Sequence, residues 1–586
     1  MKPMTTISRT LFGLQLLLLV AYTPVLAEPT LPIRIQGISG DALANVTTAL
    51  QPPPGLFSDG KANPFWLNRY LRQAPDKAAL ALEPFGYYQA KIALQIDRTQ
   101  DPPLVEVTID PGPPVRIASR RLEIVGSQDP ALLALRDQFP LAPGSILRHI
   151  PYEKAKAALQ SLAVDLGYID ASYTRHLIRI DKERLSADVE LVLETGPRYR
   201  FGTIRFIGGD DYPERFLRRY LAARRGEYFS WIDLGKTQQQ LLDSDRFSNV
   251  FITPLPPETG SDERPVDIKL EPKAPKRLRP GIGFGTDTGA RLQLRYQDVN
   301  AWHLGHEFTT DLLLAQRQQN VIVNYLFPGY RNLDTLFALR GGYQAENLDT
   351  YDTRYVFAEA EQLYGFSQNR VGSVFIRLQQ ERSTFSGANI TTQTLMPGVR
   401  YRMARLDDAT RPRSGYRLAL EARGSQEGVF SEISLLQFLA DLSWLHPLPW
   451  QTVLHLRGNA ATTLEKSNFA EIPASLRFFA GGDGSVRGYA YQSLGPKNVA
   501  GEVIGGKHLL VGSIELEKRF LQNWGTAVFF DAGNAFDNFN DYKLAKAAGI
   551  GLRYYTPVGP ARIDLARTID SDKTNYRLHI GLGVGW

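Results

Sequence analysis

The second half of the chain carries a regular alternation of apolar and polar residues. From Pro280 to Trp586, segments of about ten alternating residues are separated by clusters of turn residues, as in antiparallel membrane strands. We count sixteen such segments, from Pro280–Gly289 to Tyr576–Trp586. An even number suits a closed bacterial barrel. We therefore predict an all-β, 16-stranded antiparallel transmembrane β-barrel over residues 276–586, with an inserted loop at 464–508.

The last segment alternates most sharply. One face is wholly apolar and ends on an aromatic residue; it consists of Tyr576, Leu578, Ile580, Leu582, Val584 and Trp586. The opposite face carries Gly581, Gly583 and Gly585. A half-buried strand of a soluble protein shows the same alternation, but an aromatic last residue favours a C-terminal signal of an outer-membrane barrel.

The first half of the chain repeats one pattern three times. Short strands that end in glycine occur at Ile33–Gly37, Leu122–Gly126 and Ile204–Gly208. Each is followed by helical periodicity and then by two alternating strands, so the repeated unit is β-α-α-β-β. Of the 37 prolines, 28 lie in residues 1–280, which agrees with a change of architecture there because ladders of paired strands exclude proline. We predict three α+β domains at residues 28–116, 117–200 and 201–275.

The first 27 residues have the features of a secretory signal peptide. Lys2 and Arg9 precede the apolar run Leu11–Val20, and small residues stand at the predicted cleavage site, Ala27. No later stretch reaches the ~18 apolar residues of a membrane helix. An exported chain of this kind is either soluble outside the cytoplasm or a membrane β-barrel.

Composition excludes several classes of protein. The chain has no cysteine, which removes disulfides, thiolate metal sites and a cysteine nucleophile. The net charge of +6 is spread along 586 residues, unlike the basic stripe of a nucleic-acid binder. Hydrolase, metalloprotease and phosphate-loop motifs are missing, and the eight histidines lack metal-ligand spacing. We predict no enzyme activity, no cofactor, no metal and no nucleic-acid partner.

Two short motifs in the barrel half stand out as candidate functional residues. The inserted loop contains Val486, Arg487, Gly488 and Tyr489, and a later strand reads Phe529-Phe530-Asp531-Ala532-Gly533. A guanidinium inside a barrel needs a carboxylate partner, and Asp531 and Glu515 are both available. The residues alone do not decide between them, since most arginines are simply solvated.

Together these features resemble a known family, the POTRA–barrel outer-membrane assembly superfamily. The resemblance covers essentially the whole mature chain, and three POTRA units with the run Arg477–Gly482 ahead of the loop motif are most similar to its TamA-type members, the barrel subunits of the translocation and assembly module. It implies that Arg487 folds back into the lumen and pairs with Asp531. Phe529 would pack beside that pair, and Glu515 would be a second acceptor.

The resemblance also implies a function and a location. We expect a barrel in the outer membrane, with POTRA domains in the periplasm, that inserts client outer-membrane proteins of the autotransporter type. A TamB-like, inner-membrane-anchored protein spanning the periplasm would dock on the first POTRA domain, and outer-membrane lipid would surround the barrel. The alternatives are a two-partner-secretion transporter that exports one dedicated partner through the lumen, and a passive porin.

Glycines mark both strands that must meet to close the barrel. They are Gly281, Gly283 and Gly285 in the first strand, and Gly581, Gly583 and Gly585 in the last. Glycine weakens strand packing and permits bends. We expect this seam to open laterally and to pair with an incoming client strand, although lumen-facing glycines are also common in barrels that stay closed.

Overall fold

The structure is a computed structural model. It describes residues 31–58, 61–100, 102–329, 332–367, 369–385, 388–408, 411–556, 559–570 and 575–581. The predicted signal peptide at residues 1–27 lies outside the described residues. The chain divides into two compact units, one running through Arg200 and including Tyr228–Trp231, and one holding 201–227 and the residues from Ile232 onward. Within the described ranges, no helix has the length and apolarity needed to cross a membrane.

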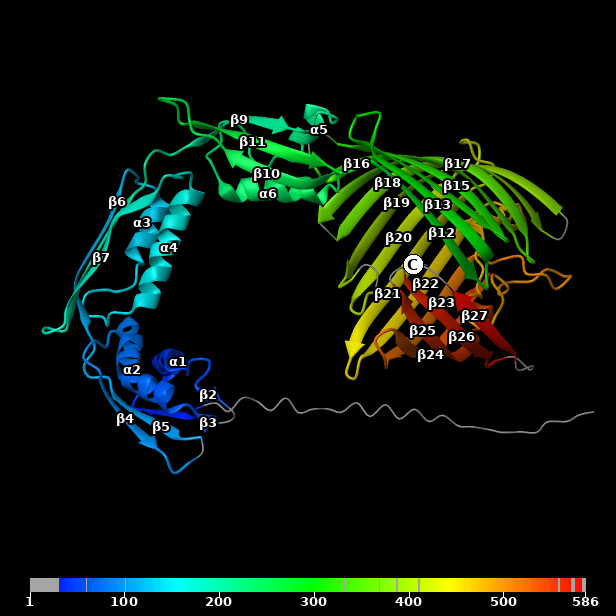
Figure 1. Cartoon of the computed structure of the whole chain (residues 1–586). Coiled ribbons are helices and arrows are strands. Elements are labelled where there is room, and N and C mark those ends of the chain that lie inside the picture. Colours follow the sequence, from blue (N-terminus) through cyan, green and yellow to red (C-terminus); the bar gives the residue numbers. More distant parts are fainter. Residues whose placement is uncertain are drawn as a thin grey trace, which may run out of the picture. The chain divides into compact units, whose positions relative to one another are not determined.

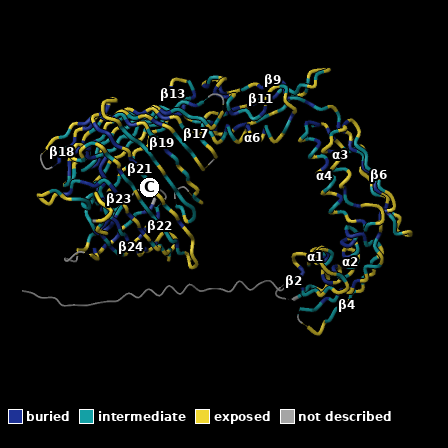
Figure 2. The backbone as a smooth tube through the Cα atoms, turned by 180° about the vertical axis from the view of Figure 1, so that it is seen from behind, coloured by how far each residue is buried: buried dark blue, intermediate teal, exposed yellow. Residues whose placement is uncertain are grey.

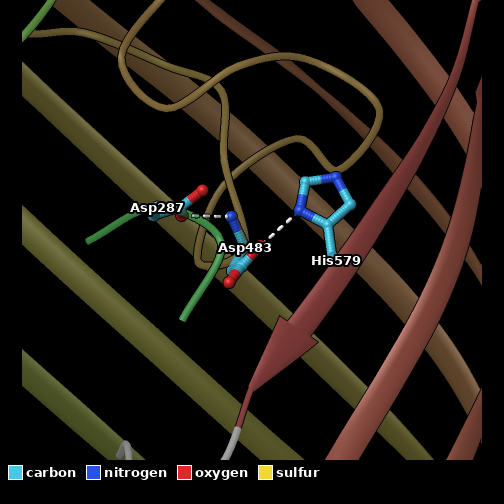
Figure 3. Close-up of side chains that lie close together, drawn as sticks. All are labelled: Asp287, Asp483 and His579. Atoms are coloured by element: carbon cyan, nitrogen blue, oxygen red, sulfur yellow. Dashed lines mark hydrogen bonds and ion pairs between the residues drawn. The ribbon is translucent and has the colours of Figure 1, made fainter. Parts of the chain in front are cut away.

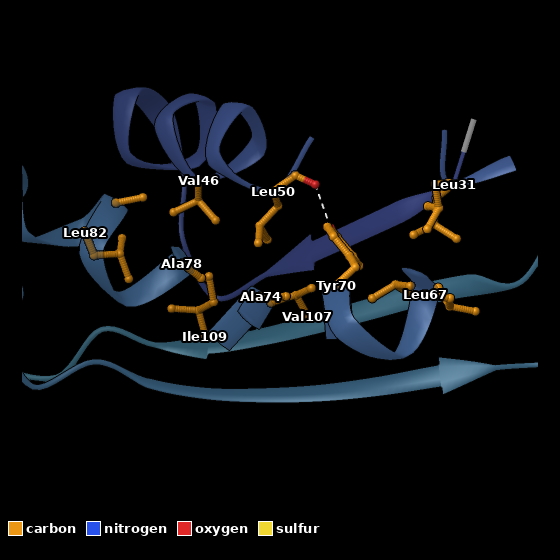
Figure 4. Close-up of a cluster of buried hydrophobic side chains, with 13 residues drawn as sticks. Leu31, Val46, Leu50, Leu67, Tyr70, Ala74, Ala78, Leu82, Val107 and Ile109 are labelled. Carbon is orange, nitrogen blue, oxygen red and sulfur yellow. Dashed lines mark hydrogen bonds between the residues drawn. The ribbon is translucent and has the colours of Figure 1, made fainter. Parts of the chain in front are cut away.

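The first small domain is a three-stranded sheet covered by helices. Its elements are β1 (Ile33–Gln36), α1 (Gly40–Ala49), β2 (Phe57–Ser58), β3 (Lys61–Ala62), α2 (Pro64–Leu82), the 3₁₀ helix η1 (Glu83–Phe85), β4 (Lys91–Asp97) and β5 (Leu104–Asp110). The sheet order is β1-β5-β4. Leucine, valine and alanine side chains from both helices pack on β5 (Figure 4), where Tyr70 donates its hydroxyl proton to the Leu50 carbonyl at 2.6 Å.

The second and third domains repeat this design. The second consists of β6 (Arg116–Val125), α3 (Pro130–Asp137), α4 (His149–Asp165), β7 (Ser172–Asp181) and β8 (Ser186–Glu194). The third consists of β9 (Arg200–Ile207), α5 (Glu214–Arg218), α6 (Trp231–Asp243), β10 (Phe247–Pro254) and β11 (Glu263–Pro272). Their sheet orders are β6-β8-β7 and β10-β11-β9. The predicted β-α-α-β-β order is confirmed, with the β2–β3 hairpin added in the first domain. The domain boundaries at 116/117 and 200/201 remain our proposal; β6 and β9 begin at Arg116 and Arg200.

The remaining strands form one closed barrel of sixteen antiparallel strands, as predicted (Figure 1). They are β12 (Lys276–Gly285), β13 (Gly289–Ala301), β14 (His306–Ala315), β15 (Gln318–Pro328), β16 (Thr335–Asn347), β17 (Asp352–Ser367), β18 (Arg370–Phe385), β19 (Ala388–Leu406), β20 (Gly415–Ser425), β21 (Leu435–Leu448), β22 (Thr452–Glu465), β23 (His508–Arg519), β24 (Trp524–Phe536), β25 (Ala545–Thr556), β26 (Gly559–Thr568) and β27 (Tyr576–Gly581).

The first barrel strand begins and ends four residues earlier than the predicted Pro280–Gly289. Its charged start was interpreted as linker, but Lys276 pairs with Asp298 of β13. The strand ends at Gly285 because residues 286–288 turn the chain, and Gly289 has a φ of +80° that suits the exit from this turn.

Exposed and buried positions alternate along the barrel strands, as Figure 2 shows. On β17, Glu359 and Glu361 are buried, whereas Val356 is 49% exposed. Carboxylates buried inside and apolar residues exposed outside mean that the outer wall of the barrel is its apolar face, as in membrane barrels. Trp302 and Trp450, which lie in tight turns between strands, are 69% and 84% exposed, as in the aromatic girdles of membrane barrels.

The connection between β22 and β23 is the lumen loop, residues 466–507. It contains the 3₁₀ helices η2 (Phe469–Glu471) and η3 (Ala474–Leu476). Ile472 and Leu476 of the loop pack on Met396, Ile433 and Leu435 of the barrel wall and its loops. The predicted insertion at 464–508 was therefore slightly too long, since the flanking strands extend to Glu465 and from His508.

Candidate functional site in the barrel lumen

Arg487 of the lumen loop binds three carboxylates of the barrel wall. Its Nε and one terminal nitrogen donate to the two carboxylate oxygens of Asp531, at 2.7 and 2.9 Å. The other terminal nitrogen donates to Glu515 at 2.6 Å and to Asp564 at 3.1 Å. The backbone N–H of Arg487 also donates to Asp531, at 3.1 Å. Two-point pairing with Asp531 fixes both the position and the orientation of the guanidinium.

Strand β24 supplies the surroundings of this pair. The guanidinium carbon of Arg487 lies 3.4 Å from the centroid of the Phe529 ring, in cation–π geometry. The side chain of Asp531 is fully buried. A Cβ on Gly533 would stand 2.6 Å from the Leu510 carbonyl oxygen, so this position admits only glycine without a shift of the wall. The structure thus brings Arg487, Asp531, Phe529, Glu515 and Gly533 into one region.

The other residues of the loop motif contact separate parts of the wall. Val486 is buried against Val511 and Ala547. The N–H of Gly488 donates to Nε2 of His579 at 2.9 Å, and the Tyr489 hydroxyl donates to Asp570 at 2.6 Å. The motif therefore ties the loop to β23, β25 and β27 and to the segment that follows β26.

Sequence reasoning missed three members of this arginine network, which consists of Arg487, Asp531, Glu515, Asp564, Arg553 and Ser513. Arg553 of β25 donates to Asp564 and, at 2.9 Å, to Glu515. The Ser513 hydroxyl donates to Asp531 at 2.6 Å. The missed signal was an isolated charge inside an otherwise apolar alternating segment, as at Asp564 in Ile563-Asp564-Leu565.

A second ion network braces the opposite part of the wall. Glu359 of β17, whose side chain is fully buried, accepts hydrogen bonds from Arg340 at 3.0 Å, Arg377 at 2.8 Å and Arg400 at 2.9 Å. Arg400 also contacts Glu361 at 3.2 Å. These residues lie on β16 to β19, so that region is held by side chains as well as by strand pairing.

The seam is the junction of β12 and β27. Gly285 pairs with Gly581, and Gly281 and Gly283 pair on their other side with Gln293 and Arg291 of β13. Gly583 and Gly585, together with Leu582, Val584 and Trp586, lie outside the described residues. The predictions made for these five residues therefore stay predictions.

The described part of β27 extends beyond the end of β12. Next to the Gly285–Gly581 pair, the Thr286 N–H donates to the Ile580 carbonyl at 3.1 Å, and the Ile580 N–H donates to the Thr286 hydroxyl at 2.7 Å. Tyr576 and Leu578, 64% and 49% exposed, lie on the outer face. Residues 576–581 pair with β26 on one side. On the other side β12 ends at Gly285, and Thr286 and the lumen loop bond to Ile580 and His579.

Asp287, Asp483 and His579 form a compact group at this place, the seam cluster (Figure 3). The Asp483 N–H donates to Asp287 at 2.7 Å, and Nδ1 of His579 forms a hydrogen bond with the Asp483 carboxylate. Asp287 is 8% exposed, and its Oδ1 has no hydrogen-bond partner among the described residues. Burial, followed by the charge of Asp483, raises the pKa of Asp287 to about 6.

The cluster has the residue types of a metal site, but its hydrogen bonds do not fit one. The Gly488 N–H donates to Nε2 of His579, so the proton of the neutral ring is on Nδ1, the atom that faces Asp483. A metal on Nδ1 would move that proton to Nε2, where it would meet the N–H of Gly488. Metal-bound histidines normally donate from the second nitrogen to an acceptor.

Comparison with known proteins decides the family. Residues 283–586, more than half of the chain, match the Omp85 superfamily domain, and residues 32–111 match the POTRA domain described as TamA domain 1. The chain belongs to the Omp85 superfamily. The resemblance stated from the sequence is thereby confirmed at the level of the superfamily. This Omp85 protein is an outer-membrane barrel whose three α/β units are POTRA domains, which are periplasmic in the family.

Individual relatives are distant. The outer membrane protein assembly factor BamA of Nitratidesulfovibrio vulgaris is 22% identical over 439 residues, which cover 71% of this chain and 54% of the relative. BamA of Neisseria meningitidis serogroup B is 20% identical over 447 residues, covering 66% and 56%. The chain spans about half the length of the curated relatives it matches.

A solved structure supports the fold. The crystal structure of BamA from Haemophilus ducreyi lacking POTRA domains 1–3 aligns with a TM-score of 0.69 at 19% identity, covering 80% of this chain and 99% of that one.

Because the POTRA domains precede β12, that strand leads out of the periplasm. The lumen loop and the turn at 286–288 therefore lie on the extracellular side, where the seam cluster is found.

Proposed function

We propose that this Omp85 protein is an outer-membrane assembly factor that inserts client barrels by opening between β12 and β27. The observation that carries the proposal is the edge of β27. Its residues 576–579 pair with β26 on one side and extend past β12 on the other, where the bonds of His579 to the lumen loop hold this edge. Once released, such an edge offers backbone N–H and C=O groups to an incoming client strand.

The occupied lumen favours a lateral route over export through the barrel. To clear the lumen, the loop would have to withdraw Arg487 from Asp531, Glu515 and Asp564. The buried Asp531 would lose its ion-pair partner, and Glu515 and Asp564 would keep Arg553 alone. Lateral opening leaves the arginine network in place. A cavity of about 520 Å³ in the lumen is lined both by seam residues, such as Gly285 and Gly581, and by Arg487 of the arginine network.

We further propose autotransporter-like clients and a TamB-like partner for the first POTRA domain. The match of residues 32–111 to a TamA-type POTRA domain supports this choice. The sheet order β1-β5-β4 makes β1 and β4 the edge strands, each able to accept an added strand from a partner. The mechanism requires no catalytic residue and no cofactor.

The experiment is depletion of the protein followed by quantification of the outer-membrane proteome. We expect a subset of barrel proteins, autotransporters among them, to fall while lipoproteins of the same membrane stay constant. Wild-type protein supplied from a plasmid should restore the subset. An unchanged set of barrel proteins after depletion would contradict the proposal.

A further inference from the structure

The seam cluster joins three segments that are far apart in the sequence. Asp287 lies in the turn after β12, Asp483 in the lumen loop and His579 on β27 (Figure 3). Because Gly285 pairs with Gly581 in an antiparallel ladder, continuing the register by two residues places Asp287 opposite His579. The loop residue Asp483 bonds to both. The cluster thus occupies the position at which the strand ladder of the seam stops.

Both nitrogens of His579 bind the same loop. Nδ1 donates to the Asp483 carboxylate, and Nε2 accepts from the Gly488 N–H at 2.9 Å. Gly488 directly follows Arg487, which is fixed in the arginine network. The last strand is therefore attached, through one side chain, to the most firmly held part of the lumen loop.

Within the seam cluster, Asp287 destabilises the closed arrangement. The Asp287 carboxylate is 8% exposed and faces the like-charged Asp483. Its Oδ2 accepts from the Asp483 N–H, but its Oδ1 has no partner within the described ranges. A buried carboxylate that has a hydrogen-bond partner on only one oxygen, and that lies close to a second carboxylate, destabilises the closed state. The cluster is therefore held strongly by the hydrogen bonds of His579 and weakly by the contact of Asp287.

We propose that Asp287, Asp483 and His579 are positioning residues that act as a latch on the seam: His579 and Asp483 hold the free edge of β27 closed, and Asp287 sets how easily it is released. The role as a latch rests on the proposed function, in which the seam opens to admit a client strand. The positions of the three groups stand independently of it.

The test measures seam opening directly, in the full-length protein in nanodiscs. The chain has no cysteine, so spin labels can be placed at Ile282→Cys on β12 and Ile563→Cys on β26 without background. Both side chains lie on the outer wall, 88% and 46% exposed, and the seam lies between them. Pulsed electron–electron double resonance measures the distance between the two spin labels. Closed and open barrels then appear as two populations of that distance.

His579→Phe removes both hydrogen bonds to the loop and should raise the open fraction several-fold. Asp287→Asn keeps the shape of the side chain and removes the charge, and should lower the open fraction at pH 8. The matched control is His508→Phe, a buried histidine on β23 whose ring bonds to Thr462 and not to the seam. It should leave the distances unchanged.

The outcomes separate the latch from the proposed function, because the distances are measured without a client. Unchanged distances in both His579→Phe and Asp287→Asn would overturn the latch, even if assembly activity were confirmed. If His579→Phe fails to fold, Asp287→Asn alone decides. Closure that depends on added Zn²⁺ and is lost with a chelator would overturn it too, in favour of a metal-bridged seam.

Discussion

At the scale of single residues, the lumen loop is held by buried charges that are paired inside the barrel. The Arg487 side chain is 4% exposed and is shared by Asp531, Glu515 and Asp564, all largely buried. Such a group contributes little when complete, since desolvation offsets much of the attraction, but breaking it is costly. Arg487 therefore acts as the anchor that decides whether the lumen loop stays docked.

Replacing Arg487 with alanine should undock the loop. Loss of the cation leaves Asp531 without its ion-pair partner and Glu515 and Asp564 with Arg553 alone. Removing one partner of a buried pair costs ~3–5 kcal/mol. The measurement is the temperature at which the barrel unfolds in a gel-shift assay, together with the rate of proteolysis of residues 466–507. Arg354→Ala, an exposed arginine on β17, is the control and should change neither. A variant with wild-type values for both would exclude an anchoring role.

Asp287 should make seam opening dependent on pH. Its pKa is raised from 3.8 to about 6 in the closed state, so the closed state is favoured at low pH and loses that advantage as the pH rises through 6. The ionisable groups that face it are Asp483 from the loop and His579 and Arg577 from β27. The open fraction should rise by roughly tenfold between pH 5 and 8, because Asp287 of the closed state loses its proton within this range.

The spin-label pair described above measures this response. Asp287→Asn leaves Asp483, His579 and Arg577 in place, so the difference between wild type and this variant isolates the contribution of Asp287. We expect the variant to show the smaller increase between pH 5 and 8. Equal increases in the two proteins would assign the pH response to another group.

At the scale of elements, the lumen loop is shaped by glycines whose backbone other residues rarely adopt. Gly488 has a φ of +95°, and a Cβ there would stand 3.2 Å from the Ala547 Cβ. The same residue donates its N–H to His579. Gly488, directly after the anchor Arg487, therefore combines three features: a left-handed backbone, a close contact with the barrel wall and a hydrogen bond to β27.

Gly488→Ala should loosen the loop while Gly484→Ala should not. An L-residue in the left-handed region costs roughly 1–2 kcal/mol, and the added methyl group also crowds β25. A Cβ on Gly484 meets nothing within 4 Å, which makes it a control in the same loop. The measurement is the rate of loop proteolysis in the folded barrel. Equal rates in the two variants would show that the conformation of Gly488 does not hold the loop.

The helices and strands could be predicted from the sequence because the apolar–polar pattern of each one is contained within its own short segment. Alternation identified all sixteen barrel strands, and the repeats identified the three POTRA units. The exact start of β12 could not be predicted, since Lys276 looks like linker until its pairing with Asp298 is known. The seam cluster was also beyond local reasoning, because Asp287, Asp483 and His579 are brought together only by barrel closure and a folded-back loop.

The known family supplied what local pattern could not. Arg487 and Asp531 are 44 positions apart, and the sequence alone left Glu515 as an equal candidate. The structure shows that both carboxylates bind Arg487, together with Asp564, which was not foreseen. The ion-pair partner of a lumen-facing charge is determined by the register of the neighbouring strands, and a single sequence does not specify that register.

At the scale of the whole molecule, side-chain networks hold two parts of the barrel wall, and the seam cluster joins the described part of the seam. The wall from β16 to β19 is crosslinked by the ion pairs of Glu359, and the arginine network holds the loop to β23, β24 and β26. At the seam, the described pairing of β12 with β27 is Gly285 with Gly581, followed by the bonds of Thr286 and the latch. We propose that the barrel opens here to assemble its clients.

The most direct test locks the seam with a disulfide between Gly285→Cys and Gly581→Cys. These positions are paired, and the native chain has no cysteine to interfere. Insertion of a client barrel into liposomes containing the purified protein is compared before and after oxidation, with each single-cysteine variant as control. We predict that the oxidised double variant loses insertion and regains it on reduction. Full insertion with the seam locked would contradict lateral opening.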